Sequence, residues 1–246
     1  VTMGASFVLG DGRSPARIIG CTVSNDSTLM GGGVYVTAGT PGDASFTMNP
    51  SAEIRRCTVV SHSYRSWNCG GGVFIQDGIF TMNGGTITDC HIAERDATTR
   101  CGGGVCLTGG ATMNANGGQI TRCTANQGGA VYNDGTIQTD ANADGTTFSG
   151  AVYNNGTISG GVFPGDVTNQ KTATISGGTF TGAVTNEAGL NYDLDSNSNL
   201  LCQGKITGGT FQGTVTNNGA VIENGTFTGD LVNKTALDRN GNTLKD

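Results

Sequence analysis

The chain repeats one short glycine-rich motif along most of its length. Residues 80–90 read FTMNGGTITDC, and related stretches follow at 113–123 (MNANGGQITRC), 175–182 (ISGGTFTG), 206–213 (ITGGTFQG) and 222–229 (IENGTFTG). A motif that returns in this way is typical of solenoids, in which each copy is one structural unit. Because one such unit cannot bury its apolar face alone, the copies are expected to stack on one another.

Three columns of apolar residues run through the repeats, always in the same order. The first column follows glycine-rich dipeptides and consists of Val34, Val73, Val105, Val131, Val152, Val167, Val184, Val215 and Leu231. The second consists of Met48, Met82, Met113, Ile137, Ile158, Ile175, Ile206 and Ile222. The third consists of Ile18, Ile54, Ile87, Ile120, Phe148, Phe163, Phe180, Phe211 and Phe227. Apolar and polar residues alternate around each column, and this period of two is typical of strands.

These columns predict a right-handed parallel β-helix, an all-β fold with three sheets and about nine coils. The spacing along the first column varies from 15 to 39 residues. A solenoid accommodates this variation because extra residues leave at the corners between strands. We expect one domain over residues 1–246, with long-loop coils over 1–150 and short regular coils over 151–246, which an insert interrupts at about 188–204.

An asparagine stands two residues after the first column in six of the coils. These residues are Asn133, Asn154, Asn169, Asn186, Asn217 and Asn233. On stacked coils such a column predicts an amide ladder, in which each side chain donates a hydrogen bond to the next.

The charge pattern excludes some classes of function. Charged residues are 13% of the chain and the net charge is −6, whereas a nucleic-acid partner requires a basic stripe. No apolar run approaches the 18 residues of a membrane span, so none is predicted. The sequence has no signal peptide and does not begin with Met, which indicates a mature protein or an excised region.

The eight cysteines fall partly into columns of their own. Cys21, Cys57, Cys90 and Cys123 each follow the third column by three residues, and Cys69 and Cys101 each precede a GGGV stretch. Residues stacked on adjacent coils lie within disulfide range, so we predict a Cys69–Cys101 bridge and at least one more in the four-cysteine column. This favours an oxidising, extracellular setting. The alternative is that all are small buried hydrophobic residues of a reduced protein.

The first four glycine-rich stretches resemble those of a known group of proteins. GGGVYV (31–36), GGGVFI (70–75), GGGVCL (102–107) and GGAVYN (128–133), with FTMN at 46–49 and 80–83, resemble the GGA[ILV] and FxxN repeats of polymorphic outer membrane proteins and related bacterial β-helix surface proteins. ISGGTFTGAVTN (175–186) is similar to repeats of large cell-surface proteins of gut bacteria. The resemblance covers most of the chain and implies a right-handed β-helix with an adhesin-like role, secreted or at the cell surface.

Long loops at one corner of the predicted coil carry an unusual share of chemically distinctive side chains. We expect the loops to form one patch, because they leave the same corner on successive coils. Its members are His62, Tyr64, Arg65, Trp67, His91, Glu94, Arg95 and Arg100. Aromatic faces beside arginine and histidine donors suit binding of a glycan or a host-surface protein. The alternative is that Trp67 packs the loop onto the coil and the charges are only solvated.

Two acidic stretches raise the question of calcium, the one cofactor that the sequence suggests. TDANADG places Asp140, Asn142 and Asp144 at alternate positions, and YDLDSNSN does the same with Asp193, Asp195 and Asn197. Oxygen ligands at alternate positions are typical of calcium loops, but the twelfth position from Asp140 is Ala151 instead of a bidentate glutamate. Ordinary Asn/Asp turns are the alternative.

Other functions stay open at this level. Tyr35, Phe74, Tyr132 and Tyr153 follow the first column and would form either an outward sugar-binding stripe or stacked rings under the long loops. A polysaccharide-active enzyme needs two carboxylates at one groove, and Asp89, Glu94 and Asp96 near His91 form the one plausible group. An ice-binding threonine array is interrupted by Gln119, Val162 and Gln212.

Overall fold

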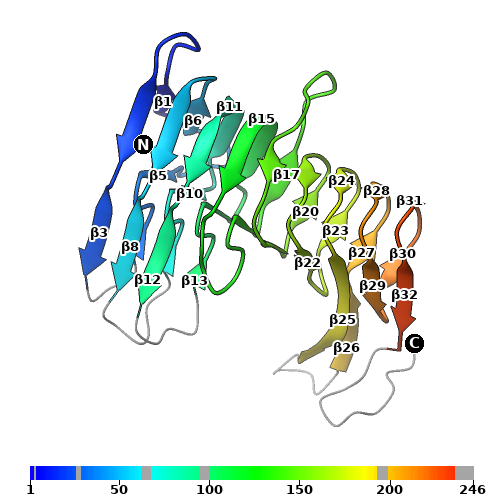
Figure 1. Ribbon diagram of the computed structural model, residues 1–246. Coiled ribbons are helices and arrows are strands. Elements are labelled where there is room, and N and C mark those ends of the chain that lie inside the picture. The colour runs from blue at the N-terminus through cyan, green and yellow to red at the C-terminus, as the bar shows by residue number, and fades with distance from the viewer. Residues whose placement is uncertain (3, 26–28, 62–67, 95–99, 193–198, 236–246) are drawn as a thin grey trace.

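The computed structural model describes residues 1–2, 4–25, 29–61, 68–94, 100–192 and 199–235. Figure 1 shows an elongated coil with the two termini at opposite ends. Strands pair in parallel with the equivalent strands of the next coil, which confirms the predicted parallel β-helix. The described segments include no helix long and apolar enough to cross a membrane.

The first sheet contains the first column in the predicted register. Its parallel strands, one from each of nine coils, are β5 (Val34–Thr37), β10 (Val73–Gln76), β14 (Val105–Thr108), β16 (Val131–Asn133), β19 (Val152–Asn154), β22 (Val167–Asn169), β25 (Val184–Tyr192), β29 (Val215–Asn218) and β32 (Leu231–Lys234). From Val34 to Val215 the column is buried, because alternate residues of each strand point into the coil.

The second and third sheets are joined, because β11 (Ile79–Thr88) and β15 (Thr112–Thr121) run through both. The second sheet contains the first halves of these strands with β1 (Ser6–Leu9), β6 (Ser45–Met48), β17 (Thr136–Gln138), β20 (Thr157–Ile158), β23 (Thr174–Ile175), β27 (Lys205–Ile206) and β30 (Val221–Ile222). The third contains their second halves with β2 (Ala16–Ile19), β7 (Ala52–Arg55), β18 (Thr147–Phe148), β21 (Val162–Phe163), β24 (Thr179–Phe180), β28 (Thr210–Phe211) and β31 (Thr226–Phe227).

The third column is also confirmed, and its aromatic part forms a continuous stack. Ile54 pairs with Ile18 and Ile87, and Ile120 pairs with Phe148. From Phe148 to Phe227 the successive rings are nearly parallel, with centroids 4.7–4.8 Å apart. Offset-stacked rings of this kind add to the burial of apolar area, so the stack is a main element of the core.

The predicted second column is wrong at its first two residues, Met48 and Met82. The prediction aligned Met48 and Met82 with Met113, but Met113 pairs with Phe80, and Met82 pairs with Ala115. The column therefore begins Phe7, Phe46, Phe80, Met113, and its three rings stack with centroids 5.4 and 5.0 Å apart. The Met-Asn dipeptide misled the alignment, because the distance to the third column sets the register and both Phe80 and Met113 stand seven residues before an Ile.

The asparagine column forms the predicted amide ladder. Each Nδ2 donates to the Oδ1 of the next coil, over distances that rise from 2.7 Å at Asn133 to 3.1 Å at Asn233. The side chains are buried from Asn133 to Asn217. Their second hydrogen bonds go to backbone carbonyls, such as that of Thr157 at 3.1 Å from Asn133. The ladder thus satisfies polar groups inside the coil.

The long loops of the first three coils contain two small parallel sheets, which we call the corner lobe. One sheet consists of β3 (Thr22–Asn25), β8 (Thr58–Ser61) and β12 (His91–Glu94), and the other of β4 (Leu29–Met30), β9 (Asn68–Cys69) and β13 (Arg100–Cys101). Leu29, Val59 and Ile92 form the core of the lobe. Sequence reasoning expected loops here, because strands of two to four residues are too short to show a periodic pattern.

The GGG stretches return the chain from the corner lobe to the first sheet. At Gly71 a Cβ atom would lie 2.8 Å from the backbone nitrogen and oxygen of His91 and would clash with the carbonyl oxygen of Gly103. Glycine is therefore required by close backbone approach between the lobe and the neighbouring coil.

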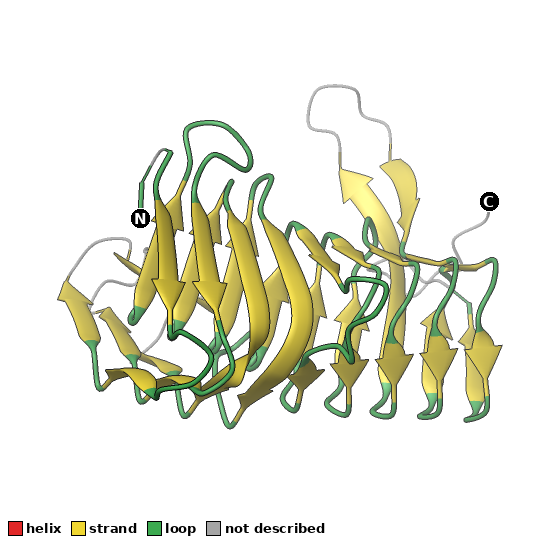
Figure 2. Ribbon diagram, turned by 90° about the horizontal axis from the view of Figure 1, so that it is seen from above, coloured by secondary structure: helices red, strands yellow, loops and turns green. Residues whose placement is uncertain are grey.

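The insert expected at about 188–204 is an antiparallel hairpin. β25 continues beyond the first sheet and pairs with β26 (Asn199–Gln203), in register from Ala188 opposite Gln203 to Tyr192 opposite Asn199. The hairpin projects from the side of the coil (Figure 2).

Candidate binding groove on the third sheet

The structure describes only part of the predicted corner patch. His62, Tyr64, Arg65, Trp67 and Arg95 lie outside the described residues. Glu94 ends β12 opposite Ser61 of β8, and Arg100 begins β13 opposite Asn68 of β9. The expectation that the loops leave one corner on successive coils is therefore met by the backbone, while the patch itself stays a prediction.

His91 lies on the described part of the corner lobe. Its ring is partly buried, and Nε2 lies 3.4 Å from the hydroxyl oxygen of Thr58 on the neighbouring strand. This contact fits a histidine that packs within the lobe. The structure gives it no described catalytic partner.

The corner lobe covers part of the aromatic stripe. Phe74 is 1% exposed and packs with Cys69, Cys101 and Cys106 between the lobe and the first sheet. Tyr35 is 39% exposed at the start of the stripe, and Tyr132 stacks on Tyr153 with centroids 5.4 Å apart. The stripe is thus split between a covered centre and two accessible ends, which does not suit a continuous sugar-binding track.

Cys69, Cys101 and Cys106 form a cluster of buried thiols in this interface. Cys69 and Cys101 are direct partners in the register of β9 and β13. Contact with the Cys69 thiol, followed by burial, raises the pKa of Cys101. The structure has all eight cysteines as free thiols, and bridging stays a prediction.

We expect oxidation to join Cys69 to Cys101, because partners on adjacent strands have a Cα separation that a disulfide accepts. Thiol titration of the oxidised protein in denaturant should then find at least two fewer thiols than the eight in the sequence, and four fewer if a second bridge forms in the four-cysteine column. In the Cys101→Ser variant the count should rise by one, since Cys69 is released, whereas Cys202→Ser should lower it by one. Eight thiols after oxidation would show that no bridge forms.

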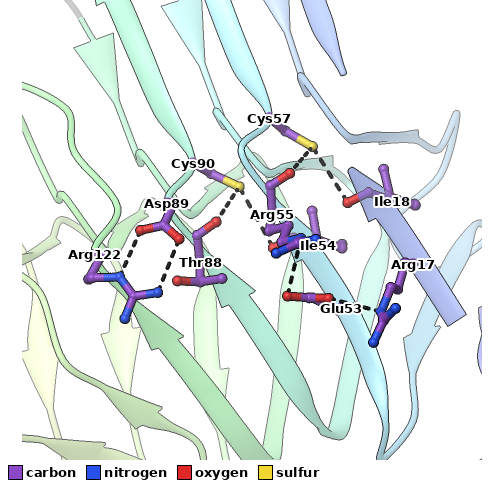
Figure 3. Close-up of polar contacts among 10 residues, drawn as sticks. All are labelled: Arg17, Ile18, Glu53, Ile54, Arg55, Cys57, Thr88, Asp89, Cys90 and Arg122. Carbon is purple, nitrogen blue, oxygen red and sulfur yellow. Dashed lines mark hydrogen bonds and ion pairs between the residues drawn. The ribbon is translucent and has the colours of Figure 1, made fainter. Parts of the chain in front are cut away.

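The four-cysteine column lies at the corner that follows the third sheet, and Figure 3 shows two of its members, Cys57 and Cys90. The thiols of Cys57, Cys90 and Cys123 donate to the carbonyl oxygens two residues earlier, at 3.5, 3.4 and 3.3 Å. Contact with Cys123 is the largest cause that raises the pKa of Cys90 to about 12. The same contact with Cys90 instead lowers the pKa of Cys123. All three side chains are buried, and burial does not suit a catalytic nucleophile.

Of the two predicted calcium stretches, the structure describes the first. Asp140, Asn142 and Asp144 are exposed, and the nitrogen of Ala143 donates to the carbonyl oxygen of Asp140 at 3.0 Å, as in a turn. The Asp140 carboxylate accepts from Asn116 Nδ2 at 2.8 Å. Asp193, Asp195 and Asn197 lie outside the described residues. Among the described residues no group of three His, Cys, Asp or Glu side chains is arranged to hold a metal ion.

An open groove follows the corner between the second and third sheets, and we call it the axial groove. It has a volume of about 520 Å³ and is lined by Pro15, Arg17, Ser51, Ala52, Glu53, Gly85, Thr86, Gly118 and Gln119. These residues come from four successive coils, so the groove runs along the axis of the coil. Gly85 and Gly118 have positive φ angles of 80° and 82° and line the groove with backbone instead of side chains.

Glu53 is the charged centre of the groove. Arg17, Glu53, Thr86 and Gln119 occupy one outward row, since each precedes a residue of the third column. Glu53 Oε2 lies 3.1 Å from Arg17 Nε, and Oε1 lies 3.5 Å from Arg55 Nε. Figure 3 shows the carboxylate between the two guanidinium groups.

A second ion pair stands at the far end of the same strands. Asp89 accepts hydrogen bonds from Arg122 Nε at 2.7 Å and Nη2 at 3.1 Å. This bidentate contact, followed by the charge of Arg122, outweighs desolvation and lowers the pKa of Asp89. Asp89 is therefore ionised near neutral pH and cannot act as a general acid there.

The corners of these coils hold ordinary residues in left-handed backbone. Ser51 has φ 72° and lines the groove, while Arg56, Asp89 and Arg122 have φ 52–54° and each precede a column cysteine. Such conformations cost energy in any residue with a Cβ.

We expect Ser51→Gly to raise the free energy of unfolding by about 0.5–1 kcal/mol, because glycine adopts positive φ without strain. Urea denaturation would measure the change. Ser14→Gly is the matched control: Ser14 is exposed and is not among the residues with positive φ. Ser14→Gly should lower the free energy of unfolding by about 0.5 kcal/mol, because glycine makes the unfolded chain more flexible. Equal effects of the two substitutions would contradict strain at Ser51.

The groove offers several donors and acceptors of hydrogen bonds. Glu53 accepts hydrogen bonds, Arg17 donates them, and the side chains of Ser51, Thr86 and Gln119 do both. The two acids that the structure describes on this face, Glu53 and Asp89, are each paired with arginine.

Sequence reasoning missed the groove as a site. It did not single out Arg17 or Glu53, it placed Asp89 in an acidic group near His91, and it treated Gln119 as an interruption of a threonine array. The residue before each third-column member was the available signal, because alternation directs Arg17, Glu53, Thr86 and Gln119 outward on successive coils.

No family model matches this chain, and comparisons with curated proteins and with solved structures found no match either.

Proposed function

We propose that this protein is a structural and adhesive β-helix module, secreted or at a cell surface, that binds a glycan chain lengthwise in the axial groove. The observation that carries the proposal is the course of the groove across four successive coils, parallel to the axis. A linear chain laid there would meet a new set of polar groups at each coil, about 4.8 Å apart.

The lining supports a ligand rich in hydroxyl groups. A sugar hydroxyl both donates and accepts, and the groove offers a carboxylate, a guanidinium, an amide and two hydroxyl groups within one row and its rim. The corner lobe begins directly after the third-sheet strands, so a ligand in the groove lies on the same coils as the predicted corner patch. The resemblance to bacterial β-helix surface proteins agrees with an adhesive role.

A glycan array followed by calorimetry tests the proposal. Gln119→Ala should weaken binding of a glycan hit by about tenfold, the effect of losing one or two hydrogen bonds. Thr210→Ala is the matched control, because Thr210 has the equivalent outward position several coils away from the groove. Failure of the wild type to bind any glycan, or equal binding by both variants, would refute the groove as the site. Trp67→Ala tests separately whether the corner patch contributes.

A further inference from the structure

We infer that the axial groove selects an acidic glycan, one with carboxylate or sulfate groups along its chain. The inference rests on the proposed function and adds the class of ligand. It starts from the charges beside the groove: Arg17 and Glu53 line it, and Arg55, two residues after Glu53, contacts the same carboxylate. Two guanidinium groups and one carboxylate leave this cluster with a net charge of +1.

Each of these arginines contacts Glu53 through one nitrogen atom, Nε, and has further N–H groups. Arg17 has 55% of its side chain exposed and approaches Glu53 through Nε. Arg55 has 34% of its side chain exposed, and its Nε atom is buried 3.5 Å from Glu53 Oε1, so only its other N–H groups could reach a ligand. A guanidinium group has five N–H donors in a planar fork that matches carboxylate and sulfate geometry. An anionic group beside Glu53 would use the donors that Glu53 leaves free.

Arginines also outnumber acidic side chains at the other end of the strands that border the groove. Asp89 is held by Arg122, while Arg56, exposed on the preceding coil, also contributes to the lowered pKa of Asp89. Two arginines thus face one aspartate at the end of the strands, as two face one glutamate at their start. Beside the groove itself, Arg17 on β2 and Arg55 on β7 belong to successive coils, so a chain with repeated anionic groups would meet positive charge on more than one coil, which a single small anion would not exploit.

The charge of the whole molecule directs an anionic chain to this half. Residues 1–122 contain eight arginines and eight acidic residues, so the net charge of −6 comes from the residues that follow. An anion is therefore repelled by the regular coils and not by the long-loop coils that form the groove.

A nucleic acid is the other linear polyanion, and the lining argues against it. Single-stranded nucleic acids are bound by aromatic stacking platforms beside a basic channel. Within the part of the chain that the structure describes, the lining residues of the axial groove include no aromatic side chain. Hydroxyl and amide groups instead surround the charged centre, as a polyhydroxylated chain requires.

The test compares ligands that differ only in charge. Calorimetry would use a uronic-acid oligosaccharide, its carboxyl-reduced counterpart, a sulfated oligosaccharide and single-stranded DNA of similar length. We expect an acidic oligosaccharide to bind about tenfold tighter than the carboxyl-reduced one at low salt, a preference that shrinks as salt screens it. Whether the uronic acid or the sulfated chain binds tighter identifies the anionic group.

Three variants separate charge selection from general binding. Arg17→Gln, on an exposed side chain that the fold does not need, should remove most of the preference. Glu53→Gln should tighten binding of the acidic chain severalfold and weaken that of the reduced one. Lys205→Gln removes one positive charge on the second sheet and is the matched control. It should change the binding of neither the acidic nor the carboxyl-reduced oligosaccharide. Equal binding of acidic and reduced chains, or tighter binding of DNA, would overturn the inference while leaving lengthwise binding intact. No binding of any glycan would instead overturn the proposed function.

Discussion

Replacing Phe180 with alanine is expected to lower the free energy of unfolding by about 3–5 kcal/mol. The ring is fully buried and stacks on Phe163 at 4.7 Å and on Phe211 at 4.8 Å. Alanine would remove both contacts and leave a cavity that rigid neighbours on two coils cannot fill. Phe180→Leu keeps much of the volume and should cost less, about 1–2 kcal/mol.

The matched control for this substitution is Phe227→Ala. Phe227 ends the stack, has the one described ring neighbour Phe211, and is only partly buried. Phe227→Ala should therefore lower the free energy of unfolding by clearly less than Phe180→Ala does, because fewer contacts are removed and water reaches the site. Urea denaturation followed by circular dichroism would measure both. Equal losses would show that the stack adds nothing beyond the burial of single rings.

The fold was predictable because its pattern is repeated many times. A strand of two residues, such as Thr179–Phe180, carries almost no signal alone. Nine coils with apolar residues in one order identify the three sheets, and errors in one coil are corrected by the others. Where the repeat is irregular the prediction failed, as at Met48 and Met82. There a recurring dipeptide was followed in place of the spacing to the next column.

The corner lobe shows the limit of pattern reading more clearly. β4, β9 and β13 have two residues each, and they form a sheet only because three long loops leave the same corner. What stabilises them is contact with Phe74 and Cys106 on the outer face of the first sheet. Contacts of this kind join residues that no periodicity links, so the sequence alone did not indicate them.

The candidate groove was missed for a related reason. Its charged residues lie 36 positions apart, at Arg17 and Glu53, and neither belongs to a recurring motif. Register brings them together, since Arg17 and Glu53 are direct partners on β2 and β7. Repeated residues in the sequence identify the apolar columns and the asparagine ladder, which form the coil. They give no information about positions that differ from coil to coil. Those variable outward positions are where a solenoid carries its specificity.

Replacing Asn169 with alanine is expected to lower the free energy of unfolding by about 3–5 kcal/mol, although it removes no apolar contact. Asn169 is fully buried, accepts from Asn154 Nδ2 at 2.7 Å and donates to Asn186 Oδ1 at 2.8 Å. Its Nδ2 also donates to the carbonyl oxygen of Lys205 at 3.3 Å. Alanine would leave a buried donor on one coil and buried acceptors on the next, each costing about 1–3 kcal/mol.

The end of the ladder provides the control. Asn233 is exposed and accepts one hydrogen bond, from Asn217 at 3.1 Å, so Asn233→Ala should cost about 1 kcal/mol or less. Asn169→Asp keeps the size but places a carboxyl group where burial raises its pKa. Its folded-state pKa then exceeds the unfolded value of about 4, so the variant should lose stability as the pH rises above that value. Denaturation at several pH values would measure this. If Asn169→Ala cost no more than Asn233→Ala, the ladder would be a consequence of the coil and not one of the interactions that hold it together.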